Sequence, residues 1–111
     1  MFDGAWLQPN TLVAAIGSSK PTTREIDDTT LERAARVLVE SADQAMREAG
    51  DLVLSRDHSS LKSKILEIGH LINSQSSAEK ELEGITVFKS VGVGIADVAL
   101  AEKVHKHMPL I

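Results

Sequence analysis

Residues 11–17 read TLVAAIG, a short and continuous apolar run that ends at a glycine. Runs of this length are typical of strands that are buried on both faces, as in parallel sheets. The connection that follows, residues 17–23, is a loop by composition, since it holds serines, threonines and a proline beside the glycine. The stretch therefore predicts a buried strand over residues 11–16 with a loop at its carboxyl end.

A helix and a second strand are expected next along the chain. The tetrapeptide at residues 29–32, Thr-Thr-Leu-Glu, fits a capping box with Thr29 as the N-cap. The short helix that it opens is expected to run through Ala34 and Ala35. Residues 37–39 then form a second apolar run, Val-Leu-Val, which predicts the second strand and ends at Glu40.

The same alternation continues to the third strand. Residues 41–44, Ser-Ala-Asp-Gln, form a second capping box, and its helix is expected to stop at Gly50 in a conformation of positive φ. Residues 85–88, Ile-Thr-Val-Phe, predict the third strand. Strands and helices that alternate through short connections favour an α/β fold with a parallel sheet.

Two further helices are predicted from apolar spacing. One begins at Ser59 or Ser60 and presents one face, formed by Leu61, Ile65, Ile68 and Ile72. The polar stretch after it predicts a mobile loop over residues 73–84. The last helix begins near Ile95 and carries one side formed by Val98, Ala101 and His105.

Bulk composition limits the class of protein. The 111 residues are one domain in length, residues 1–111, and carry a net charge of -4, which argues against nucleic-acid binding. The chain holds no cysteine, which excludes disulfides and thiol chemistry. No apolar run approaches the ~20 residues that span a membrane. A cytoplasmic protein without a nucleic-acid or membrane partner is expected.

Three segments together carry a family resemblance. The first is Trp6 to Pro21, which contains the opening strand and the sequence AIGSSKP. The second joins REID at residues 24–27 to EAGDL at residues 48–52, and the third is TVFKSVG at residues 86–92, with Asp97 after it. In this order they resemble the ornithine cyclodeaminase/mu-crystallin family, over about residues 2–103.

The resemblance implies the second half of a dinucleotide-binding domain. The expected fold is a partial Rossmann-like, three-layer unit with about three mainly parallel strands flanked by helices. Members of the family bind NAD or NADP and act on amino acids or cyclic imines. By resemblance, the cofactor-binding positions of this chain are Ile16, Gly17, Ser18, Ser19 and Ser90, and the substrate-binding position is Val91.

The loop after the first strand departs from the family at two positions. Ser19 stands where cyclodeaminases and alanine dehydrogenases carry an aspartate that handles an amine proton, and a serine does not act as a base at neutral pH without a partner. Thr23 stands where some members have a lysine that contacts the cofactor. Lys20 and Arg24 are the nearby cations, and both are interpreted as solvated loop charges. No catalytic residue is therefore assigned.

The segment after the third strand can also be explained by structural roles alone. Without the resemblance, Val91 is plain packing at a strand end and Ser90 makes a turn hydrogen bond. Residues 92–97, Gly-Val-Gly-Ile-Ala-Asp, imitate a dinucleotide fingerprint, but Asp97 would repel a pyrophosphate there. The segment is interpreted as a tight strand-to-helix turn in which Asp97 complements the helix dipole. None of the four histidines has a partner at metal-ligand spacing, so no metal site is predicted.

Three functions remain open, of which the third is a generic small-ligand binder that uses the crevice at the strand ends. The first is a truncated, folded module that has no catalysis on its own, associates with itself as a homodimer through an unpaired strand edge, and binds a small molecule or NAD(P) weakly or not at all. The second is the nicotinamide-side half of an NAD(P)-dependent ketimine reductase, cyclodeaminase or amino-acid dehydrogenase that needs a missing N-terminal part. The reading frame upstream of Met1 would decide between a fragment and a genuine short gene product.

Overall fold

The four strands found among the described residues form one parallel sheet. The computed structural model describes residues 1–74 and 83–108. The strands are β1 (Leu12–Ala15), β2 (Ala34–Val39), β3 (Ile65–Glu67) and β4 (Ile85–Lys89). Their spatial order is β1-β4-β2-β3, and every pairing is parallel. The α/β class and the three strands predicted from apolar runs are confirmed. The fourth strand, β3, was not predicted from the sequence.

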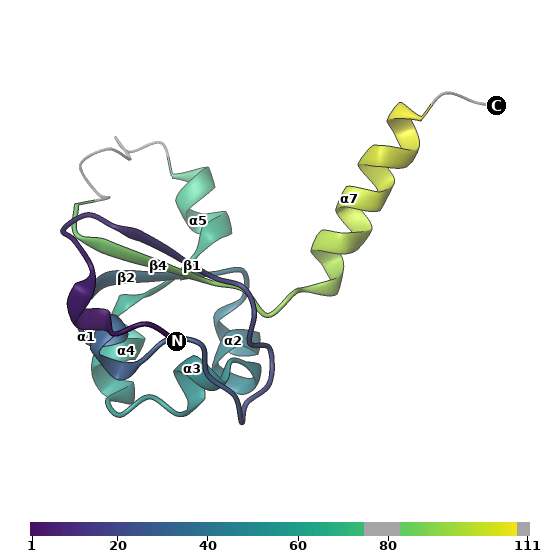
Figure 1. Cartoon of the computed structure of the whole chain (residues 1–111). Coiled ribbons are helices and arrows are strands. Elements are labelled where there is room, and N and C mark those ends of the chain that lie inside the picture. The colour runs from purple at the N-terminus through teal and green to yellow at the C-terminus, as the bar shows by residue number, and fades with distance from the viewer. Residues whose placement is uncertain (75–82, 109–111) are drawn as a thin grey trace.

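Helices lie on both faces of the sheet, as a three-layer unit requires. Figure 1 shows one group below the sheet and α5 above it. The lower group is α1 (Asp28–Arg33), α2 (Ala42–Glu48), α3 (Gly50–Val53) and α4 (His58–Lys64). A 3₁₀ turn, η1 (Gly4–Trp6), precedes β1, α5 spans Ile68–Asn73, and α7 spans Gly94–His107.

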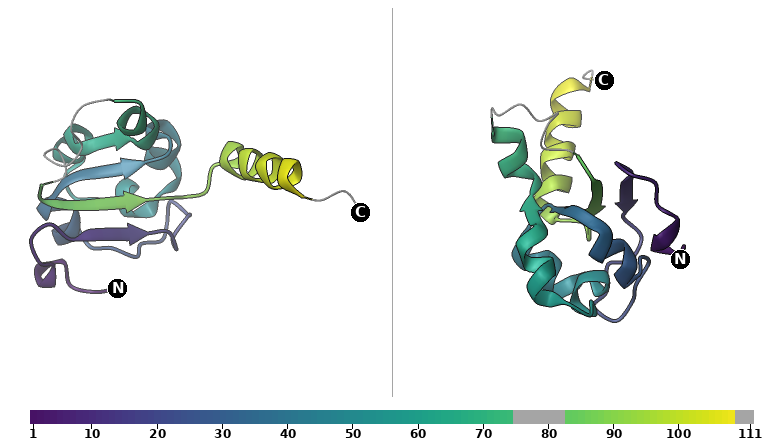
Figure 2. Two further views of the ribbon diagram at one scale, coloured as in Figure 1. Left: turned by 90° about the horizontal axis from the view of Figure 1, so that it is seen from above. Right: turned by 90° about the vertical axis from the view of Figure 1, so that its left-hand side faces the viewer.

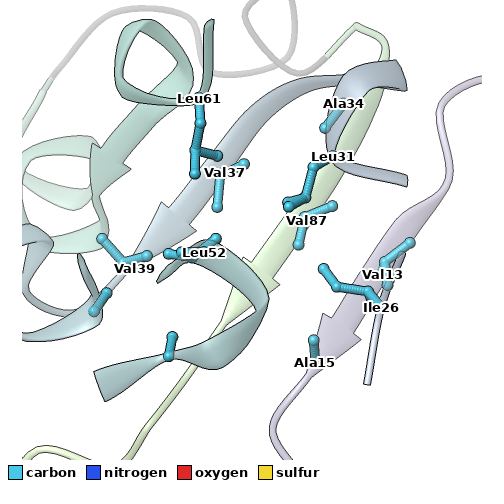
Figure 3. Close-up of a cluster of buried hydrophobic side chains, with 12 residues drawn as sticks. Val13, Ala15, Ile26, Leu31, Ala34, Val37, Val39, Leu52, Leu61 and Val87 are labelled. Carbon is cyan, nitrogen blue, oxygen red and sulfur yellow. The ribbon is translucent and has the colours of Figure 1, made fainter. Parts of the chain in front are cut away.

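The core lies between the sheet and the lower helices. Figure 3 shows Val13, Val87 and Val37 from three neighbouring strands pointing toward Leu31, Leu52 and Leu61 of the helices. Val37, Val87 and Leu52 are fully buried. The opposite face is open at β1, because the side chains of this strand alternate between exposed and buried. The prediction that the first strand is buried on both faces is therefore wrong, since β1 is an outer strand whose Leu12 side chain is exposed.

The first helix begins and ends earlier than predicted. Its N-cap is Asp27 and not Thr29: the Asp27 carboxylate accepts hydrogen bonds from the backbone N–H of Thr30 at 2.8 Å and from its hydroxyl at 2.6 Å. Ala34 and Ala35 belong to β2 and not to the helix. Tertiary pairing overrides the local signal here, because Ala34 is buried and lies in register with Ile85 of β4.

The second helix confirms Ser41 as its N-cap, but its predicted end at Gly50 is wrong. The Ser41 hydroxyl accepts from the backbone N–H of Gln44, and the helix ends at Glu48. Gly50 begins α3 with a negative φ. A glycine is needed there for a close approach of backbones: a Cβ would meet the carbonyl oxygen of Lys20 at 2.6 Å and would lie still closer to that of Thr23.

The predicted long helix with Leu61 and Ile72 on one face is also wrong. The chain forms α4 with Asp57 as its N-cap, then β3, and then α5. Ile65 leaves the helical path because it pairs with Val37 of β2. Of the loop expected over residues 73–84, residues 75–82 lie outside the described residues.

The last helix stands away from the rest of the molecule. Figure 2 shows α7 extending from the sheet after a short connection. Its start at Gly94 confirms the predicted start near Ile95, and Asp97 lies in its first turn. None of its residues is buried, so the side that carries Val98 faces solvent.

Candidate functional site at the carboxyl ends of β1 and β4

Two loops that carry all of the predicted site residues leave the sheet side by side. β1 and β4 are neighbouring parallel strands, and Ala15 is in register with Lys89. The loop at residues 16–19 therefore begins beside Ser90 and Val91. The backbone N–H of Ser90 donates to the carbonyl oxygen of Ala15 at 3.1 Å, which ties the two loops together where they begin. In doubly wound sheets, ligands bind at this end of the strands.

The first loop combines an exposed apolar side chain with a fixed backbone. Ile16 is 68% exposed, which is high for a large aliphatic side chain at a strand end. The N–H of Gly17 donates to both carboxylate oxygens of Glu25, at 2.8 and 3.0 Å. The hydroxyl of Ser18 lies 2.6 Å from that of Thr23 and donates to its carbonyl oxygen at 2.8 Å. Ser19 is exposed.

A buried ionic cluster supports this loop from below. Lys89 is the last residue of β4, and its side chain, including the ammonium group, is fully buried. The Nζ atom lies 2.7 Å from Oε1 of Glu25 and 2.8 Å from Oδ2 of Asp51, whose side chain is also fully buried. The other oxygen of Asp51 accepts from the backbone N–H groups of Glu25 and Ile26, at 2.7 and 2.9 Å. Two carboxylates thus surround one ammonium group.

The carboxyl group of Glu25 remains ionised to a low pH. Burial on its own would raise the pKa of Glu25, but the hydrogen bond from Lys89 and those from the backbone of Ser18 and Gly17 outweigh it. The pKa therefore lies below the ordinary value of 4.5. A Cβ at Gly17 would meet Oε2 of Glu25 at 2.5 Å, so a larger residue there would push the Glu25 carboxylate out of its present position.

The second loop holds its two predicted site residues differently. The Ser90 hydroxyl donates to Oε1 of Glu40 at 2.6 Å and accepts from the N–H of Gly92 at 3.3 Å. The turn hydrogen bond expected of Ser90 in a purely structural role is thus present. Val91 is half-buried and packs against the hydrophobic core. Gly92 has a φ of 78°, which gives the turn into α7 the left-handed conformation that a glycine adopts without strain.

Arg24 is not a solvated loop charge, as the sequence had suggested. Its guanidinium group donates to the carbonyl oxygens of Ile26 and Leu54, at 3.2 and 3.3 Å, and forms an ion pair with Asp28 at 3.1 Å. The side chain is only 18% exposed. Arg24 therefore anchors the segment that carries Glu25. Lys20, by contrast, is exposed.

The matched family model spans nearly the whole chain, residues 1–109. The chain belongs to the ornithine cyclodeaminase/mu-crystallin family. This confirms the resemblance that the three sequence segments carry. Those segments supply the three members of the ionic cluster: Glu25 lies in REID, Asp51 in EAGDL and Lys89 in TVFKSVG.

The chain is similar to named members of the family and to members whose structures have been solved. The mouse ketimine reductase mu-crystallin is 35% identical over 102 residues, covering 92% of this chain and 30% of its own length. A structure described as a probable ornithine cyclodeaminase from Bordetella pertussis Tohama I is 40% identical, with a TM-score of 0.82, covering 99% of this chain and 37% of that one. The chain therefore spans about a third of the relatives that it matches.

A more distant structure shows the same fold. The Thermococcus litoralis Δ1-pyrroline-2-carboxylate reductase, solved in complex with NADH and L-proline, has a TM-score of 0.72 at 22% identity. The match covers 93% of this chain and 32% of that one. The four-stranded parallel unit is thus a Rossmann-like arrangement that this family member shares with a protein that binds NADH.

The ionic cluster is the feature of the site that the sequence interpretation missed. A signal for it was present, because Lys89 directly follows an apolar strand and Asp51 stands between a glycine and the apolar residues 52–54. Charged residues inside apolar stretches are rarely buried without partners. The pairing joins residues that lie far apart in the sequence, so it depends on the tertiary fold.

Other kinds of site find no support in the described part of the chain. Residues 1–74 and 83–108 contain no group of three His, Cys, Asp or Glu side chains that could hold a metal ion. Within the same residues, no helix has the length and apolar character needed to cross a membrane.

Proposed function

We propose that this chain forms the nicotinamide-side wall of an NAD(P) site, as part of an imine or amino-acid oxidoreductase or a cyclodeaminase. The cofactor-binding residues are Ile16, Gly17, Ser18, Ser19 and Ser90, and Val91 faces the substrate. The bound dinucleotide supplies the hydride chemistry, while this chain supplies a shaped surface and hydrogen-bonding groups.

The observation that supports the proposal is the exposed end of the β1–β4 pair. Two loops begin there side by side, and the family resemblance assigns both of them to the cofactor. Ile16 is an exposed aliphatic side chain that the face of a nicotinamide ring would cover.

The proposal includes no catalysis by this chain on its own. Ser19 occupies the position of the amine-handling acid in cyclodeaminases, and a serine hydroxyl is no base at neutral pH without a partner. The carboxylate of Glu25 is committed to the Gly17 N–H and to Lys89. Neither residue is a free acid–base group, so proton transfer depends on residues outside this third of the enzyme.

A titration with NADH and NADPH tests the cofactor site. We expect the isolated chain to bind weakly, with a dissociation constant of roughly 1 mM or above. The amide resonances of residues 16–19 and 90–91 should move together in NMR spectra. Perturbations elsewhere on the molecule would contradict the site, and saturable micromolar binding would contradict the weakness of the isolated chain. With a cyclic imine added, NADH absorbance should stay constant.

We also propose that the chain associates with a second copy of itself. β1 is an outer strand of the sheet, and its Leu12 is 65% exposed. Unpaired strand edges pair readily with other chains. On α7, Ile95, Val98 and Leu100 are more than half exposed, and a second copy would shield such side chains from water. Light scattering should give twice the monomer mass of 12.0 kDa, and a monomer mass at high concentration would contradict the proposal.

A further inference from the structure

We infer that Glu25 is a positioning residue that couples the two cofactor loops to each other, so that neither loop shifts without the other. The inference rests on the proposed cofactor site for its functional meaning. Its physical basis is the way in which one carboxylate joins the backbone of the first loop to the end of strand β4.

A single oxygen atom makes both contacts. Oε1 of Glu25 accepts from the Gly17 N–H at 2.8 Å and from the ammonium group of Lys89 at 2.7 Å. Gly17 is the second residue of the first loop, and Lys89 directly precedes Ser90 of the second loop. Charge-assisted hydrogen bonds of this length are among the stronger polar contacts in proteins. Any separation of the loops would break one of these two contacts.

Asp51 gives the coupling a rigid base. It accepts from the backbone N–H of Glu25 and also pairs with Lys89, so it fixes both partners from below. Lys89 and Asp51 are fully buried, whereas the Glu25 side chain is 30% exposed. Glu25 is thus the member of the cluster that lies at the surface of the proposed site. Loss of the Glu25 contact would leave the buried ammonium group of Lys89 with only one of its two carboxylate partners, which disfavours a state in which the loops separate.

Substitution of Glu25 tests the coupling in the full 111-residue chain. Glu25→Gln keeps an acceptor for Gly17 but removes one of the two negative charges that Lys89 contacts. We expect the amide resonances of Ser90 and Val91 to move, although the side chain of Glu25 bonds to Gly17 and Lys89 and not to these two residues, and NADH binding to weaken about tenfold. The matched control is Glu32→Gln, which breaks the exposed ion pair with Arg56 and should leave both loops and NADH binding unchanged.

A second measurement needs no substitution. In NMR spectra of the unsubstituted chain, a scalar coupling through the hydrogen bond should be detectable between the amide nitrogen of Gly17 and the carboxyl carbon of Glu25. Its absence would overturn the inference, as would a Glu25→Gln spectrum in which only residues near Gly17 move. If NADH perturbs no loop of the unsubstituted chain, the proposed function fails, while the amide measurements still decide whether the loops are coupled.

Discussion

Two lysines of this chain form ion pairs of almost the same length in opposite surroundings. Lys89 lies 2.7 and 2.8 Å from its carboxylate partners and its side chain is fully buried at the end of the sheet. Lys106 lies 2.9 Å from Glu102 on α7, where both side chains are about two-thirds exposed. The distances alone do not distinguish them. Burial does, because water screens one pair and is excluded from the other.

Removing each lysine gives the largest expected difference between the two regions. Lys89→Met leaves Glu25 and Asp51 without their cation and should lower the free energy of unfolding by about 3–5 kcal/mol. Lys106→Met should leave stability unchanged within error, since exposed pairs contribute little. Urea denaturation followed by circular dichroism measures both. Equal effects of the two substitutions would show that the buried cluster does not stabilise the fold.

Glycine replacements sharpen the comparison at the level of the backbone. In Gly50→Ala the new methyl group would collide with the carbonyl oxygens of Lys20 and Thr23, so stability should fall by about 1–3 kcal/mol. Gly94→Ala, at the start of α7, meets no atom within 4 Å and has no positive φ, so it should be neutral or slightly stabilising. The two midpoints of thermal unfolding decide. A neutral Gly50→Ala would mean that the loop at residues 20–23 yields easily.

The sequence predicted those parts of the fold that depend on local pattern. The apolar runs at residues 37–39 and 85–88 lie in strands whose side chains are mostly buried, and the run at residues 11–16 gives the outer strand β1, of which only Val13 and Ala15 are buried. The prediction failed where long-range pairing competes with local preference. Ile65 belonged to a helical pattern and became a strand residue, because an open position existed beside β2. No local signal reveals which neighbour a segment will find.

The candidate site follows the same division. The family motifs located the loops at residues 16–19 and 90–91, and the sheet register places these loops side by side. The contact between Glu25 and Lys89 joins residues that are 64 positions apart, so its geometry depends on the whole fold. Arg24 was misinterpreted for the same reason, because its partner carbonyl at Leu54 lies 30 positions away.

Lowering the pH should reduce the stability that the buried cluster contributes, with a smaller effect than the substitutions above, and should leave the contribution of α7 unchanged. The pKa of Glu25 is lowered in the folded state, and so are those of Asp27 and Asp28, the latter chiefly by the hydrogen bond from Arg24. The stability that Glu25 contributes is therefore complete above its unfolded pKa of about 4.5 and is lost as the pH falls through the lower, folded value.

Denaturation in urea between pH 7 and pH 3 measures this loss. The free energy of unfolding should decline below about pH 4.5 and should decline less steeply in Glu25→Gln, because that variant has one fewer carboxylate to protonate. Glu102→Gln on α7 is the control, since Glu102 pairs with Lys106 and lies far from the buried cluster. An unchanged slope in Glu25→Gln would contradict the role of Glu25 in acid stability.

Removing α7 should have the smallest effect on the stability of the sheet and its helices. A chain that ends at Val93 loses a helix with no buried residue, so the urea midpoint of the monomer should not move. Isolated helices of this length are marginally stable in water. The part of the circular dichroism signal that the shortened chain lacks should therefore, in the full chain, decrease gradually with urea and not in the cooperative transition. Measurement at two protein concentrations separates the contribution of self-association from that of folding.

The same deletion also tests what the exposed side chains of α7 do. If α7 shares in self-association, the shortened chain should scatter as a monomer where the full chain is a dimer. A matched variant keeps the helix but replaces the exposed Ile95 and Leu100 with serine, and it should dissociate in the same way. A dimer that survives in both variants would assign association to the edge of β1. A lower urea midpoint in the monomeric shortened chain would show that α7 packs on the sheet in solution.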